Sequence, residues 1–233
     1  MKKLSLPLAV FAGLALSAAP AFAELSVNVG AISVMPSDSS SSLNVVETVA
    51  GLPANSTGVS VNNNTQLGLT FDYKLNSNWA VQVIAATPFS HDISGTGTLD
   101  GLRIGETKHL PPTLMGQYYF NVSNSKFEPF VGVGINYTTF FNTKANAELV
   151  TTLEAIGATT ATDRVSIKLD DSWGLALQAG FNYAVSETVG VHFMVSKIQL
   201  DTDAAVRVNG TTIEQVNVTI DPLVAMLGVR WSF

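Results

Sequence analysis

Histidine and aspartate side chains give this sequence its first possibility of chemistry. His91 and Asp92 precede a segment rich in glycine and threonine, and His109 follows it, so the three side chains meet if the flanking segments pair. Two imidazoles and a carboxylate in contact would form a weak divalent-metal site. Single histidines beside a surface loop are far commoner, and we therefore expect no metal and no cofactor.

Three charged residues, Asp72, Lys74 and Arg230, lie on the polar faces of segments in which polar and apolar residues alternate. If these faces point into a barrel, the charges must pair, because an unpaired buried charge is costly. The paired charges would form either a stabilising plug or a gate in the lumen, with Gln117 and His192 on equivalent faces. We expect His192 to be hydrogen-bonded there and not catalytic.

The hydroxyl nucleophiles do not form a catalytic arrangement. Covalent catalysis needs a nucleophile, a base and an orienting group at one place. The serines gather at 39–42, in a predicted loop away from His192. No glycine-rich phosphate loop leads from a strand into a helix. We therefore expect no enzymatic activity and no nucleotide binding.

The composition excludes other classes of protein. The sequence has 233 residues, no cysteine and a net charge of −6, which excludes disulfide scaffolds and argues against a nucleic-acid partner. Hydrophobic residues make up 46% of the chain. After the N-terminal segment, however, no run approaches the roughly 20 consecutive apolar residues of a membrane-spanning helix. A transmembrane barrel instead spreads its apolar residues over alternate positions.

Residues 1–23 are predicted to be a cleaved signal peptide. Lys2 and Lys3 precede an apolar stretch, and Ala21-Phe22-Ala23 has the small-x-small pattern of a cleavage site. Residues 24–233 would then form a single outer-membrane barrel domain.

The final segment, from Asp221 to Phe233, predicts the class of fold. Its apolar residues recur at every second position up to the end of the chain. Trp231 and Phe233 fit an aromatic girdle at a membrane surface. We therefore expect the closing strand of a bacterial outer-membrane barrel, with Val229, Trp231 and Phe233 as the signal read by the outer-membrane assembly machinery.

Seven earlier segments alternate in the same way, which predicts eight antiparallel strands. In the third of these strands, the residues expected to face the lipid are Trp79, Val81, Val83, Ala85 and Phe89. Long connections follow the odd strands at 36–63, 93–108, 143–169 and 201–215, and short turns follow the even strands. This asymmetry is typical of outer-membrane barrels, which have short periplasmic turns and long extracellular loops. A short helix is expected within 145–155. The alternative, a soluble lipocalin-like barrel with its apolar residues inside, is disfavoured by the aromatic residues at the strand ends.

The apolar positions change parity before the final strand. Val216, Val218 and Ile220 are even-numbered, whereas most large apolar residues after Pro222 are odd-numbered. Because proline inside a strand usually marks a bulge or an edge, we expect the phase of the strand to flip at Asp221-Pro222.

The lumen of an eight-stranded barrel has room for side chains or one small ligand, but not for a wide aqueous pore. Its outer half is predicted to be lined by apolar residues, namely Ile32, Val34, Ile84, Ala86, Pro88, Pro111, Met115, Phe130, Phe140, Ile198 and Leu200. One interpretation is a pocket that takes up a hydrophobic molecule from outside and passes it into the wall or the lumen. The other is that these residues simply fill the barrel core.

Five motifs and the closing segment carry a family resemblance. They are the stretch from Asn63 to Phe71, Ala85-Ala86-Thr87-Pro88-Phe89-Ser90-His91, the stretch from His109 to Phe120, the stretch from Phe130 to Phe141, Asp171-Ser172-Trp173-Gly174, and Asp221 to Phe233. Together they resemble the OmpW family of bacterial outer-membrane proteins over nearly all of the mature chain, except at 45–61 and 145–162. The resemblance implies an eight-stranded barrel with a narrow, largely apolar lumen that passes small hydrophobic compounds.

The predicted function is a narrow channel or receptor in the bacterial outer membrane for the passive uptake of small hydrophobic molecules. The alternative is a structural or surface-interaction barrel whose extracellular loops bind a host, a phage or a toxin. The expected partners are outer-membrane lipid, lipopolysaccharide, the assembly machinery and a small hydrophobic ligand. We expect a monomer, because a closed barrel has no free edge to pair.

Overall fold

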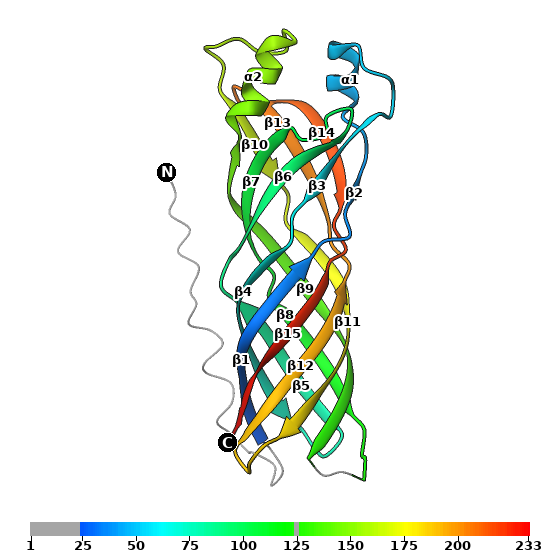
Figure 1. Ribbon diagram of the computed structural model, residues 1–233, viewed down its shortest axis with the longest axis vertical. Coiled ribbons are helices and arrows are strands. Elements are labelled where there is room, and N and C mark those ends of the chain that lie inside the picture. The colour runs from blue at the N-terminus through cyan, green and yellow to red at the C-terminus, as the bar shows by residue number, and fades with distance from the viewer. Residues whose placement is uncertain (1–23, 124–125) are drawn as a thin grey trace.

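Eight long antiparallel strands close into a barrel in the computed structural model, which describes residues 24–123 and 126–233 (Figure 1). These strands are β1 (Glu24–Met35), β4 (Asn64–Lys74), β5 (Trp79–Ala86), β8 (Thr113–Tyr119), β9 (Phe127–Ala145), β11 (Ser172–Ala184), β12 (Val189–Ile198) and β15 (Leu223–Ser232). Their order is β11-β12-β15-β1-β4-β5-β8-β9, and pairing of β11 with β9 closes the circle. The predicted eight-stranded antiparallel barrel is confirmed. The predicted signal peptide lies outside the described residues.

The outer face of this barrel is apolar. Leu67, Val133 and Leu177 are more than half exposed, on three different strands. The aromatic residues at the strand ends are exposed as well, namely Tyr73, Trp79, Phe120, Trp173, Tyr183, Trp231 and Phe233. So large an exposed apolar surface is stable only against lipid, which confirms the transmembrane interpretation and excludes the lipocalin-like alternative for this part of the chain.

One end of the barrel carries Glu24, Phe233 and the short turns (Figure 1). In the first turn, the Asn76 side-chain oxygen accepts hydrogen bonds from the backbone N–H groups of Asn78 and Trp79, both at 2.9 Å. We call this end the turn end. Neither helix among the described residues is long and apolar enough to cross a membrane.

The opposite end rises into a second tier of strands, which we call the extension (Figure 1). It contains β2 (Ser39–Ser40), β3 (Thr57–Val61), β6 (Phe89–Gly97), β7 (Arg103–Leu110), β10 (Val165–Leu169), β13 (Asp201–Val208), β14 (Thr211–Thr219), α1 (Asn44–Ala50), α2 (Ala147–Ala155) and the last part of β9. The four long connections lie where the sequence predicted them, but they are largely strands and not irregular loops. The predicted short helix is present as α2.

The β13–β14 hairpin is an example of these strands, with a tight turn, a polar outer face and an apolar inner face. Its turn is Asn209-Gly210, with φ values of 50° and 86°, and positive φ at both central positions is the geometry of a tight hairpin turn. Polar residues such as Gln215 cover the outer face, while Val216 and Val218 are buried inside. In the sequence, the Asn-Gly pair and the alternation of these valines are the features that indicate a hairpin here.

The predicted flip of phase at Asp221-Pro222 is wrong. Even-numbered residues face inward on both sides of it, since Val218 is 4% exposed and Val224 is 5% exposed. What changes at this point is the surroundings of the outer face. The exposed residue Gln215 before it faces water, and the exposed residue Leu223 after it faces lipid. The extension is consequently apolar inside and polar outside, whereas the barrel below it is apolar outside.

Candidate functional site

Buried polar side chains fill the half of the lumen nearest the turn end. Asp72 on β4 forms an ion pair with Arg230 on β15, and both are buried. The Asn28 amide donates to Asp72 Oδ2 at 2.8 Å and to Thr70 Oγ1 at 2.6 Å. The Gln82 amide donates to Asp72 Oδ1 at 2.7 Å. The amides of Asn28 and Gln82 thus hold the carboxylate that pairs with Arg230.

The same network continues across the lumen to the strands on the far side. Gln178 donates to Gln82 at 2.8 Å, and Gln117 donates to Gln178 at 2.9 Å. The Tyr119 hydroxyl donates to Gln117 at 3.1 Å and accepts from Asn182 at 3.3 Å. These residues come from β5, β8 and β11, so the network spans the barrel and leaves its lower lumen filled by side chains.

Further side chains close the network at its two ends. His192 Nδ1 lies 2.7 Å from the Asn182 side-chain oxygen, and the ring of His192 stacks on Phe130. At the turn end of the barrel, Lys74 Nζ lies 2.7 Å from a carboxylate oxygen of Glu128 and 3.8 Å from one of Glu24. We call the whole polar network the plug.

An apolar layer separates the plug from the extension. It contains three fully buried methionines, Met115, Met194 and Met226. Ile84 and Ile198 belong to the same buried cluster. Because polarisable methionine side chains fill irregular gaps, this layer packs closely against the polar side chains below it.

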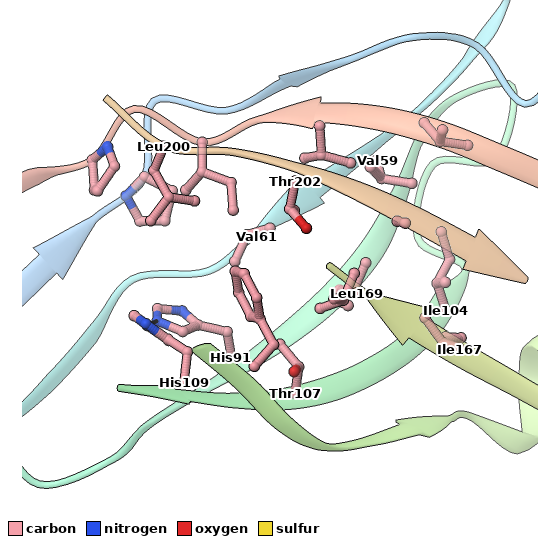
Figure 2. Close-up of a pocket in the computed structure, with 18 of the residues that line it drawn as sticks. Val59, Val61, His91, Ile104, Thr107, His109, Ile167, Leu169, Leu200 and Thr202 are labelled. Atoms are coloured by element: carbon pink, nitrogen blue, oxygen red, sulfur yellow. Dashed lines mark hydrogen bonds between the residues drawn. The ribbon is translucent and has the colours of Figure 1, made fainter. Parts of the chain in front are cut away.

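An apolar cavity of about 70 Å³ lies inside the extension, between β3, β6, β7 and β9 on one side and β10, β13 and β14 on the other (Figure 2). We call it the upper cavity. Val59, Ile104 and Ile167 line one end of it, and His91 and His109 lie side by side at the other end. Its remaining lining is almost entirely aliphatic, with Phe140 and a few prolines and threonines. Such a surface binds apolar molecules by burying their area.

The two histidines form a buried pair beside the upper cavity. Their Nε2 atoms are 3.0 Å apart, and His91 Nδ1 lies 2.6 Å from the backbone oxygen of Asn62. Phe89 stacks on the ring of His109 with centroids 5.2 Å apart. The pair lies above the lipid-facing belt, because its neighbours on the outer faces of β6 and β7 are polar. Burial lowers the pKa of His91 and lowers that of His109 to about 3.

The wall of the barrel has a gap in its backbone ladder just below this pair. The β5–β8 pairing ends at Ile84 and Thr113, and the β6–β7 pairing begins at Phe89 and His109. No register pair joins 85–88 to 110–112 within the described chain. Pro111 and Pro112 have no N–H to contribute to a ladder. The backbone pairing is therefore interrupted at the boundary between the barrel and the extension.

A second, smaller cavity lies behind this gap. It has a volume of about 20 Å³ and is lined by Ala85, Ala86 and Pro111 on the gap side and by Ile198 and Val224 across the lumen. Phe89 also lines it. Since Phe89 stacks against both histidines of the upper cavity, its ring separates the two cavities.

The structure places most of the residues predicted to line the lumen, although it does not test their roles. Those buried in the lumen are Ile84, Met115, Ile198, Asp72, Gln117, His192 and Arg230. Ala86 and Pro111 line the smaller cavity, and Phe140 and Leu200 line the upper cavity. Val229, Trp231 and Phe233 lie exposed on β15 or directly after it. Their role as an assembly signal stays a prediction.

Three predicted positions were wrong. Pro88 is exposed, and Phe89, predicted to face lipid, is fully buried, because the chain breaks between β5 and β6 and the inward parity shifts by one residue. Phe130 lies in the lumen but near the turn end, paired in register with Tyr119 three residues into β9. The predicted position in the outer half is therefore wrong, because a residue so close to the start of β9 at Phe127 lies beside the turn that precedes this strand.

The histidine pair also differs from its prediction. The sequence suggested that His91 and His109 could meet, and they do, but they are buried and not surface residues. Asp92 is exposed on the outer face of β6. It donates its backbone N–H to Asn62, so it does not join the two rings.

Sequence reasoning missed most of the upper cavity. Much of its lining comes from strands predicted to be loops, including Val59, Ile93, Ile104, Ile167 and Val206. Short period-two runs of valine and isoleucine were the only signal. They were weak because each run is only a few residues long and is bordered by threonine, asparagine and glycine.

The fold and the site together define a class of protein, a bacterial outer-membrane β-barrel with a structured extension. Within that class, the sequence model of the OmpW family matches residues 22–233. The chain belongs to the OmpW family, and it is a protein of the bacterial outer membrane.

Known relatives agree with this assignment. Outer membrane protein W of Vibrio cholerae serotype O1 is 42% identical over 239 residues, which cover 100% of each chain. Outer membrane protein W of Escherichia coli K12 is 42% identical over 176 residues, or 76% of each chain. The crystal structure of OprG from Pseudomonas aeruginosa superposes with a TM-score of 0.77 at 36% identity, covering 91% of this chain and 96% of that one.

Proposed function

We propose that this protein takes small hydrophobic molecules from the outside into the upper cavity and releases them into the membrane through the gap in the wall. One observation carries the proposal, namely that an apolar cavity lies directly above a lumen filled by the plug. The expectation drawn from the OmpW resemblance, passage of small hydrophobic compounds, supports it. The lipid around the barrel would receive the ligand.

The plug argues against passage along the barrel axis. A hydrophobic molecule moving down the lumen would have to separate hydrogen-bonded glutamines and a buried ion pair, and each broken bond would leave a buried polar group without a partner. The gap between 85–88 and 110–112 involves no such cost, because no backbone pairs bridge it. Exit through the wall is therefore the easier route for an apolar ligand.

The upper cavity suits passage more than storage. Apolar burial contributes about 25 cal/mol per Å² without directional bonds, so a small ligand is held weakly and can leave. Transport is passive in this account, because the barrel offers no coupling to an energy source. The alternative function, recognition of a host, phage or toxin by the outer tips, would leave the cavity without ligand. Lipopolysaccharide and the assembly machinery stay predicted partners.

Filling the gap tests the exit route. We expect Ala86→Phe to slow delivery of an apolar fluorescent probe from the outside into the membrane by about fivefold or more, because overpacking a passage adds about 1–3 kcal/mol. Probe binding in the upper cavity should persist, since Ala86 lines only the smaller cavity. Delivery is measured in liposomes and binding by the change in probe fluorescence.

The matched control is Ala179→Phe, which adds the same ring on the lipid-facing side of β11, where Ala179 is exposed. It should deliver the probe at the wild-type rate. Equal delivery by Ala86→Phe and Ala179→Phe would rule out this exit.

A further inference from the structure

Among the described residues that line the upper cavity, one buried side-chain nitrogen or oxygen has no hydrogen-bond partner, and this atom is His109 Nδ1. The hydroxyls of the cavity are satisfied, since Thr107 shares a hydrogen bond of 2.8 Å with Thr143 and Thr202 donates to the Asp170 carbonyl at 2.7 Å. A buried nitrogen left unpaired costs stability unless something pairs with it. In a binding cavity, that partner can be the ligand.

The neighbouring contacts fix the protonation of this nitrogen. The backbone oxygen of Asn62 can only accept, so His91 Nδ1 carries the hydrogen. In a neutral ring, His91 Nε2 is then an acceptor. The hydrogen between the two Nε2 atoms must come from His109, which leaves His109 Nδ1 with a lone pair and no hydrogen.

Both rings are neutral at neutral pH. Burial lowers the pKa of His91 and lowers that of His109 to about 3, and the proximity of the two rings acts in the same direction on His109. The negative charge of Asp92 acts in the opposite direction and raises the pKa of His91, but the effect of burial is larger. The tautomer derived from the geometry is thus the one present under ordinary conditions, and His109 Nδ1 is an acceptor.

We propose that the upper cavity selects hydrophobic molecules that carry one hydrogen-bond donor, such as hydrophobic alcohols and phenols, and that the donor binds His109 Nδ1. This inference rests on the proposed function, since it concerns the ligand of the same cavity. A pure hydrocarbon would leave His109 Nδ1 unpaired. A carboxylate would bring a charge without a donor into an apolar surface, so it would be excluded.

Three naphthalenes of nearly equal size separate these ligand classes. The probes are 1-naphthol, which has a donor, 1-methylnaphthalene, which has no polar atom, and 1-methoxynaphthalene, which has only an acceptor. Binding is measured on the refolded full-length mature protein in lipid nanodiscs, with empty nanodiscs as the correction for partition into lipid. We expect 1-naphthol to bind about tenfold more tightly than 1-methylnaphthalene, the order expected for one hydrogen bond to a buried acceptor.

His109→Phe alone would leave His91 Nε2 as a new unpaired acceptor, because the hydrogen that this nitrogen accepts comes from His109. The double variant His91→Phe, His109→Phe keeps two rings that can stack on Phe89 and Phe140 and removes both acceptor nitrogens. We expect this variant to bind 1-naphthol and 1-methylnaphthalene equally. A second measurement needs no variant: the ¹⁵N shifts of the histidine rings in the wild-type protein report which nitrogen carries the hydrogen. We expect His109 Nδ1 to be unprotonated at pH 7.

The outcomes separate this inference from the proposed function. Equal binding of 1-naphthol and 1-methylnaphthalene by the wild type, or a hydrogen on His109 Nδ1, would overturn the selectivity while leaving hydrophobic uptake intact. Failure of all three naphthalenes to bind would overturn both. A tenfold preference that disappears in the double variant His91→Phe, His109→Phe would support the donor site.

Discussion

Replacing Arg230 with methionine is expected to lower the free energy of unfolding of the barrel by about 3–5 kcal/mol, because it removes one partner of a buried ion pair. Asp72 is 0% exposed and would keep its charge in the lumen without a cation. Its hydrogen bonds from Asn28 and Gln82 satisfy its oxygens but do not neutralise it. Urea unfolding of the refolded barrel, followed by tryptophan fluorescence, measures the loss.

Two comparisons make this prediction specific. The double variant Asp72→Asn, Arg230→Met removes both charges and should recover much of the lost stability, since no buried charge remains. Lys144→Met removes an exposed pair with Glu106 and should change stability by less than about 1 kcal/mol. A barrel with Arg230→Met that is as stable as the wild type would contradict the description of the plug.

Introducing a charge into the upper cavity is expected to abolish most of the uptake. Val216 on β14 is 4% exposed and lines this cavity. Val216→Asp would place a carboxylate where an apolar ligand has to sit, and desolvating it costs well over the roughly 1.4 kcal/mol that corresponds to a tenfold change. We expect probe uptake to fall by about tenfold or more.

The neighbouring residue on the same strand provides the control. Gln215 is exposed on the outer face of β14, so Gln215→Asp adds the same charge to water and should leave uptake unchanged. Because the barrel below is a separate buried cluster, both variants should still insert into membranes with the heat-resistant mobility of a folded barrel. Undiminished uptake by a folded Val216→Asp barrel would exclude the upper cavity as the binding site.

The transmembrane barrel was predictable because lipid imposes one simple rule on its strands. Residues such as Leu67 and Leu177 face outward at every second position, and the short turns leave little choice of register. The faces of Asp72 and Arg230 followed from the same alternation. That these charges must pair followed as well, but the partner of Asp72 did not, since Arg230 lies 158 positions away in sequence.

The extension was not predictable by that rule, because its surroundings are reversed. Val218 and Val224 face the same interior, but water lies outside the first and lipid outside the second, so a rule that places apolar residues outward fails at Asp221-Pro222. Only the location of the membrane boundary, which alternation does not give, would have corrected this error. Phe89 and Pro88 were misplaced for a different reason, because the inward parity shifts by one residue between β5 and β6.

The histidine pair illustrates a limit of a different kind. Sequence spacing suggested that His91 and His109 could meet, but burial depended on Phe140 and on β10, β13 and β14, none of which had been placed over them. The residues of chemical interest were therefore visible, while their environment was not. That environment determines whether the pair is a surface feature or part of a binding cavity.

The most direct test of the account compares two transport modes of the wild-type protein in liposomes and planar bilayers. Delivery of an apolar fluorescent probe into the membrane is measured beside ion conductance through the barrel. We expect saturable probe delivery with little or no conductance, because the cavity is apolar and the plug fills the lumen. Steady ion conductance without saturable probe delivery would contradict it, since that result requires an open aqueous lumen.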